Sequence, residues 1–98
     1  MKTIAFDAEY ANKLELAISS EFGCNRSEIL SLRDSFVKKV TVFILFKTKD
    51  YDTRVLGANY QISWLYIPTV IKEIEYMLKV VPGFEIKIKN VYQLISEK

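Results

Sequence analysis

The sequence has no histidine, only one cysteine, three glycines and two prolines among its 98 residues. Without histidine, Ser–His and Cys–His catalysis and most kinds of zinc site are excluded. The single thiol, Cys24, cannot form a disulfide within the chain, which favours a reducing cytoplasm. Three glycines are too few for a Gly-rich phosphate-binding loop. These absences point away from an enzyme, a metal or a cofactor, and toward a small binding domain.

Long apolar runs are missing too. The longest, Val42 to Phe46, is far shorter than a membrane-spanning helix requires. An acidic residue, Asp7, lies too close to the N-terminus for a signal peptide. The chain is nevertheless rich in core-forming residues, because half are hydrophobic and the Phe, Tyr and Trp residues number six, six and one. This composition is typical of folded chains. We therefore expect one globular domain over residues 1–98, located in the cytoplasm, with no membrane segment.

Neither sign of charge is in large excess, since the formal net charge is only +2. Its distribution is uneven. Residues 1–35 carry four basic and six acidic side chains, whereas residues 36–98 carry ten basic and six acidic ones. A DNA-facing surface is therefore expected in the C-terminal two thirds of the chain. The alternative is that these lysines only keep the surface solvated.

Apolar residues recur at helical spacing through most of the chain. The clearest stripe runs from Ala8 to Phe22, where Asp7 suits an N-cap and Gly23 a left-handed C-terminal position. Pro68 suits the first turn of a later helix, because its missing N–H is unbonded there in any case. The predicted helices cover about 7–22, 26–32, 33–48, 52–60, 68 to the stop at Pro82-Gly83, and 84–96.

Two of these segments also have features of strands. Residues 33–48 are rich in β-branched side chains, and residues 84–89 alternate between apolar and polar. A helical spacing competes in both, for example Phe36, Val40 and Phe43 in the first. Because a lone strand has no partner among helices, we predict helices, and an all-α bundle of five or six helices. The side chains expected in its core are Phe22, Leu30, Val40, Phe43, Leu56, Ile71 and Ile74.

The helix 52–60, a turn and the helix from Pro68 follow the order of a helix-turn-helix, in which the second helix enters the major groove. The sequence motifs at and before this unit are Glu21-Phe22-Gly23, Glu28-Ile29-Leu30-Ser31, Leu56-Gly57-Ala58-Asn59-Tyr60 and Pro68-Thr69-Val70-Ile71. On these motifs, residues 14–78 resemble the C-terminal DNA-binding domain of the replication initiator DnaA, in the Trp-repressor-like helix-turn-helix superfamily.

The resemblance implies a duplex DNA-binding protein without catalytic activity. The family's Gly-Gly-Arg-Asp-His-Thr-Thr signature is replaced here by Gln61 to Thr69, which lacks the Arg, Asp and His. The initiator's ATPase part is also absent, so the expected role is that of a phage or mobile-element regulator of replication or transcription. The side chains expected to contact DNA are Lys38, Lys39, Arg54, Asn59, Gln61, Ser63, Tyr66, Thr69 and Lys72.

These side chains have different expected roles. The lysines and Arg54 would hold phosphates, whereas Thr69, Gln61 and Ser63 would reach phosphates or base edges. We expect Trp64, which precedes the helix that begins at Pro68, to pack into the core over Pro68. The competing hypothesis is a protein-interaction module, in which the same surface binds a protein partner or a second copy. The near-neutral charge and the aromatic lead-in favour that alternative.

Overall fold

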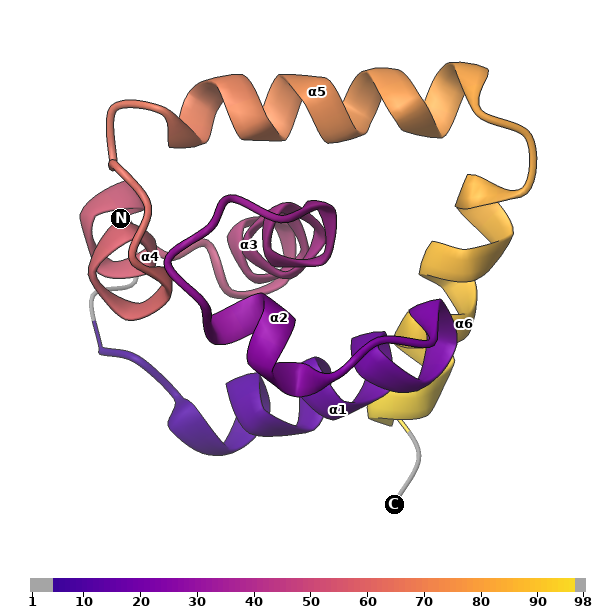
Figure 1. Ribbon diagram of the computed structural model, residues 1–98, viewed down its shortest axis with the longest axis horizontal. Helices are drawn as coiled ribbons and strands as arrows, with labels where there is room; N and C mark the ends of the chain where they lie inside the picture. Colours follow the sequence, from indigo (N-terminus) through magenta and orange to yellow (C-terminus); the bar gives the residue numbers. More distant parts are fainter. Residues whose placement is uncertain (1–4, 97–98) are drawn as a thin grey trace.

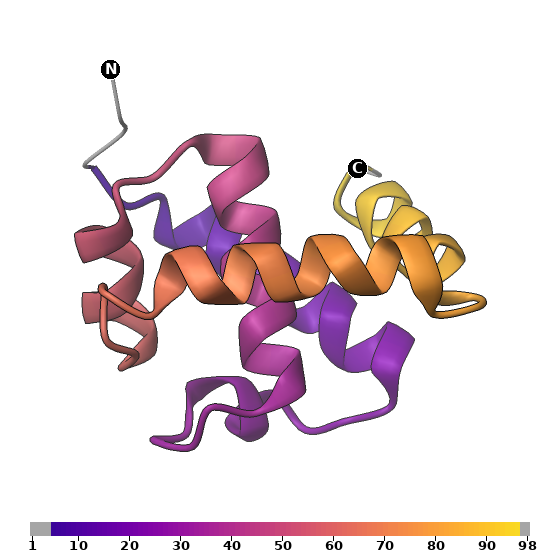
Figure 2. The same cartoon turned by 90° about the horizontal axis from the view of Figure 1, so that it is seen from above.

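The structure is a computed structural model that describes residues 5–96 of the chain. These residues form six α-helices, which confirms the predicted all-α fold. In Figure 1, α3 lies in the middle, and Figure 2 shows α5 crossing it. α3 contacts α1, α2, α4 and α5, whereas α6 packs on α1 and α5. The bounds are α1 Ala8–Phe22, α2 Arg26–Leu30, α3 Phe36–Lys49, α4 Thr53–Tyr60, α5 Ile67–Val80 and α6 Phe84–Ser96.

The predicted caps of the first helix are confirmed. The carboxylate of Asp7 accepts a hydrogen bond from the Tyr10 N–H at 3.0 Å, and Gly23 ends α1 with φ of 64°. In α2, the Glu28 side chain accepts from the backbone N–H of Asn25 at 3.1 Å. α2 ends at Leu30, two residues earlier than predicted, because Ser31 has an extended backbone.

Both segments with strand-like composition are helices. α3 begins after Ser35, whose side-chain oxygen accepts from the Lys38 N–H. Every residue from Val40 to Leu45 is buried, which is possible because four other helices surround α3. Thr41 lies among them, and its hydroxyl donates to the Val37 carbonyl at 2.8 Å, so its burial leaves no unpaired polar group. Four apolar residues of α6 at helical spacing are buried, as predicted: Phe84, Ile88, Val91 and Ile95.

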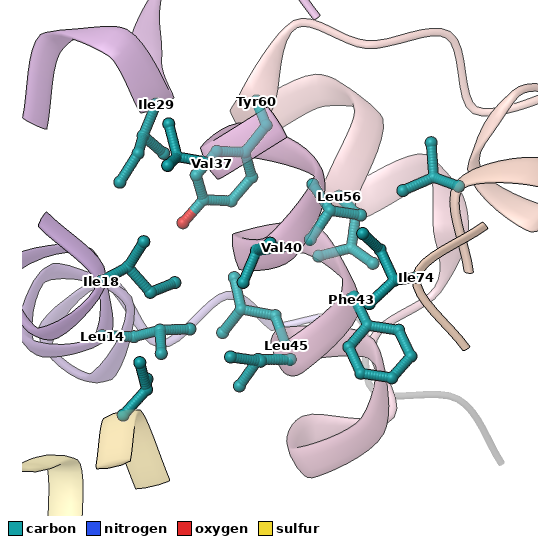
Figure 3. Packing of buried hydrophobic residues seen from close by; sticks show 14 of the residues in the cluster. Leu14, Ile18, Ile29, Val37, Val40, Phe43, Leu45, Leu56, Tyr60 and Ile74 are labelled. Atoms are coloured by element: carbon teal, nitrogen blue, oxygen red, sulfur yellow. The ribbon is translucent and has the colours of Figure 1, made fainter. Parts of the chain in front are cut away.

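The hydrophobic core surrounds α3, and Figure 3 shows side chains of α1, α3, α4 and α5 meeting there. The prediction for Leu30 is wrong, because its side chain is 42% exposed. The preceding residue, Ile29, is buried instead, since adjacent residues point about 100° apart on a helix. Phe22 is half-buried against the rings of Phe36 and Phe84. The other predicted core residues are buried: Val40, Phe43, Leu56, Ile71 and Ile74.

A buried carboxylate, Glu15 of α1, connects three helices. One of its oxygens accepts from the Tyr60 hydroxyl of α4 at 2.6 Å, and the other accepts from Nε of Arg26 in α2 at 2.8 Å. Burial raises the pKa of Tyr60 above its ordinary value, and the neighbouring Glu15 raises it further. This network fixes α4, and therefore the start of the α4–α5 unit, on the rest of the bundle.

Candidate nucleic-acid interface

The turn between α4 and α5 has a defined shape. Gln61, the residue after α4, adopts φ of 55°, and the Ile62 N–H donates back to the Gly57 carbonyl at 3.1 Å. The Tyr66 N–H then donates to the Ser63 carbonyl at 2.9 Å, just before α5 begins. Ile62 and Ile67 are both buried. The turn is thus anchored at both ends, and residues 63–65 are exposed between the anchors.

Gly57 lets this turn lie directly against α4. A Cβ atom at this position would be 2.6 Å from the Ile62 carbonyl oxygen and 3.3 Å from the Trp64 nitrogen. No ordinary side chain fits in that space without moving the backbone. The glycine therefore sets how closely α4 and the turn approach each other.

Trp64 lies on the surface, and the prediction that it packs in the core is wrong. Its side chain is 44% exposed, and the guanidinium carbon of Arg54 lies 4.8 Å from its ring centroid. The buried residues on either side of it are Ile62 and Ile67. This cation–π contact keeps the positive charge of Arg54, at the start of α4, close to the turn.

The outward face of α5 carries polar side chains. Thr69 and Lys72 are exposed, as the predicted contacts require, and Tyr76 and Lys79 continue the same face at spacings of four and three residues. The inward face buries Ile67, Val70, Ile71 and Ile74. Tyr76 and Lys79 were missed by the sequence analysis. Their position opposite the apolar stripe of α5 was the signal that could have found them.

The acidic residues of α5 are paired with lysines of α3. Glu73 lies 3.1 Å from Nζ of Lys39, and Glu75 lies 2.8 Å from Nζ of Lys47. The hydrogen bond and charge of Lys47 lower the pKa of Glu75 below its ordinary value. These ion pairs offset two negative charges on the sides of the helix.

The two predicted phosphate contacts of α3 have other partners. Lys38 is fully buried and its Nζ donates to the Ser31 carbonyl at 2.5 Å, so the prediction that it holds a phosphate is wrong. Burial lowers the pKa of Lys38, while Asp34 opposes that shift. Position 38 shares a helix face with the buried Thr41, Val42 and Leu45, which explains its burial. Lys39 is half-buried, paired with Glu73 and 5.7 Å from the ring centroid of Tyr66.

The remaining predicted residues lie around the turn. The Asn59 side chain is exposed, but its amide donates to the Val55 carbonyl within α4 at 2.9 Å. Gln61 and Ser63 are exposed in the turn itself. Tyr66 is half-buried and packs against the core, which makes it a support for α5. The structure thus brings Arg54, Gln61, Ser63, Thr69 and Lys72 to the surface of one α4–turn–α5 unit.

Comparisons of the chain with protein-family models, with curated proteins and with solved structures gave no match. Within residues 5–96, no group of three or more His, Cys, Asp or Glu side chains is placed to hold a metal ion. None of the described helices is long and apolar enough to cross a membrane.

Proposed function

We propose that the chain binds duplex DNA without catalysis, as the resemblance to the DnaA DNA-binding domain implies, and serves as a phage or mobile-element regulator of replication or transcription. The observation that carries this proposal is the outward face of α5. Its first turns expose Thr69 and Lys72, while its inward face is anchored on α3. An exposed first turn on an anchored helix supports this proposal, because a recognition helix presents its N-terminal residues to the major groove.

The side chains divide into two groups by chemistry. Arg54 and Lys72 are exposed cations that suit phosphates on either side of the groove. Thr69, Gln61 and Ser63 offer hydroxyl and amide groups that suit base edges or phosphates. Lys39 supports binding indirectly, because its pair with Glu73 reduces the repulsion between α5 and a phosphate.

The first experiment measures anisotropy of labelled random duplex DNA over a salt series. Two phosphate contacts, from Arg54 and Lys72, predict a log–log salt slope of about −1.8, since each contributes about −0.9. Lys72→Glu should weaken binding to every sequence and flatten the slope by about 0.9. Lys89→Glu on α6 is the matched control: it changes the net charge equally at an exposed lysine outside the α4–turn–α5 unit, and should weaken binding less.

The second candidate function is a protein-interaction module on the same surface. The observation that favours it is the exposed apolar tip of the turn, where Trp64 and Leu65 lie next to each other. Protein partners bind through such anchors more than through rim charges. Absence of duplex binding at low salt, where electrostatic attraction is strongest, would replace the DNA proposal with this one. Leu65→Ser should then reduce association with the partner more than Lys72→Glu.

A further inference from the structure

Tyr76 has a large aromatic side chain that lies outside the hydrophobic core. It is 64% exposed in the middle of α5, opposite the buried residues Ile71 and Ile74. Its hydroxyl has no hydrogen-bond partner among residues 5–96. Figures 1 and 2 show the outer side of α5 with no other helix over it. A tyrosine in this setting adds nothing to the core, and its ring and hydroxyl are free to meet a ligand.

The position of Tyr76 relates it to the proposed DNA contacts. Thr69, Lys72 and Tyr76 follow at spacings of three and four residues, so they share one helix face. Tyr76 follows Thr69 by seven positions, which is about 10 Å along the helix axis. For a helix that lies along the major groove, that length corresponds to about three base pairs at roughly 3.4 Å each.

The electrostatics around Tyr76 favour an anionic partner. Lys72 precedes it by four residues and Lys79 follows it by three, and both are exposed. The nearest acids on α5, Glu73 and Glu75, are each paired with a lysine of α3. A polyanion can therefore approach the outer face of α5 beyond the first turn, with one cation on each side of the tyrosine.

We infer that Tyr76 is a specificity-determining residue, whose ring contacts the 5-methyl group of a thymine in the major groove, an inference that rests on the proposed DNA-binding function. The thymine methyl is the apolar feature of that groove, and apolar side chains read it by direct contact. The base pair concerned lies about three positions from the one that Thr69 reaches.

The test begins with selection of bound duplexes from a random library, using the wild-type chain and Tyr76→Ala. The wild type should select a thymine at one position that Tyr76→Ala no longer prefers, with an unchanged salt slope because no charge is lost. The control is Ile86→Ala on α6, which truncates another side chain of 64% exposure and should keep the wild-type preference.

Replacement of that thymine by uracil then removes only the methyl group. It should weaken wild-type binding about fourfold, the factor expected for burying one such carbon, and should leave the affinity of Tyr76→Ala unchanged. Tyr76→Phe, which keeps the ring, should retain the effect of uracil.

Three outcomes would overturn the inference. In the first, the wild type binds duplex DNA and Tyr76→Ala selects the same sites. In the second, Tyr76→Ala abolishes self-association in sedimentation experiments while the DNA preference is unchanged, which would make Tyr76 part of a protein interface. In the third, the wild type binds no duplex at low salt, which would overturn the proposed function as well.

Discussion

Replacing Tyr60 with phenylalanine tests whether the buried network of Glu15 holds the bundle together. The change removes one hydroxyl and keeps the ring, so it creates almost no cavity. In the wild type that hydroxyl donates to Glu15 at 2.6 Å, and both side chains are buried. In Tyr60→Phe, one carboxylate oxygen loses its donor, while the other keeps Arg26 at 2.8 Å.

The size of the effect follows from the charge of the acceptor. A hydrogen bond to a charged group contributes about 1.5–3 kcal/mol, more than the 0.5–1.5 kcal/mol of a neutral one. The buried carboxylate cannot replace the lost donor with bulk water. We therefore expect the free energy of unfolding to fall by about 1.5–3 kcal/mol. Urea denaturation followed by far-UV circular dichroism measures it, with an unchanged m value showing that the loss belongs to the folded state.

Glu15→Gln provides the matched background for this experiment. An amide oxygen still accepts from the Tyr60 hydroxyl, but the acceptor is neutral, so Tyr60→Phe should cost less in that background. The reasoning is refuted by a loss below about 0.5 kcal/mol in the wild-type background. It is refuted equally by the same loss in both backgrounds, because the carboxylate charge would then play no part.

The remaining predictions concern the turn, the core and alkaline pH. Gly57→Ala places a Cβ 2.6 Å from the Ile62 carbonyl oxygen, so the free energy of unfolding, measured by thermal unfolding, should fall by about 1–3 kcal/mol. An unchanged melting temperature would mean that the turn can move away from α4 at no cost in stability. Lys38→Met should lower stability by about 1–3 kcal/mol, because the Ser31 carbonyl loses its donor, and should not alter duplex affinity; a selective loss of affinity would restore Lys38 as a phosphate contact. Phe43→Ala should cost about 3–5 kcal/mol in urea denaturation, whereas a cost below about 1 kcal/mol would contradict its place in the core. Because the pKa of Tyr60 is raised on folding, its contribution to the free energy of unfolding should be complete below pH 10 and should decrease as the pH rises further. Above pH 10 the unfolded chain releases the phenolic proton while the folded chain keeps it. The decrease should be weaker in Tyr60→Phe.

Much of the fold could be predicted because its signals are local. The caps Asp7 and Gly23 and the inward stripe of α5 depend on residues within one helix. Finer assignments failed where the outcome depends on how a helix is rotated against its neighbours. Ile29 rather than Leu30 is buried for this reason. Lys38 is buried because α3 is covered on several sides, which its own sequence does not specify.

The candidate site was predictable in part. The order of α4, turn and α5, and the exposure of Thr69 and Lys72, agree with the spacing of the sequence. By sequence, Glu73 and Glu75 would repel a phosphate beyond the first turn of α5 if they faced it. The partner of Glu73 is Lys39, 34 residues earlier. Such long-range pairs depend on the packing of α3 against α5, and no local motif predicts them.

The pairing of α1 with α6 has a consequence for synthesis of the chain. Among the described helices α1 is made first and α6, which packs on it with Phe84, Ile88 and Val91 buried, is made last. At about 5–20 residues per second, the ribosome needs about 1–3 s to add the 13 residues of α6. Until then, the apolar side of α1 that α6 will cover stays open to other nascent chains and to chaperones. A ribosome that stalls before residue 84 would hold a polypeptide that contains most of the core residues but lacks α6, the helix that covers one side of α1.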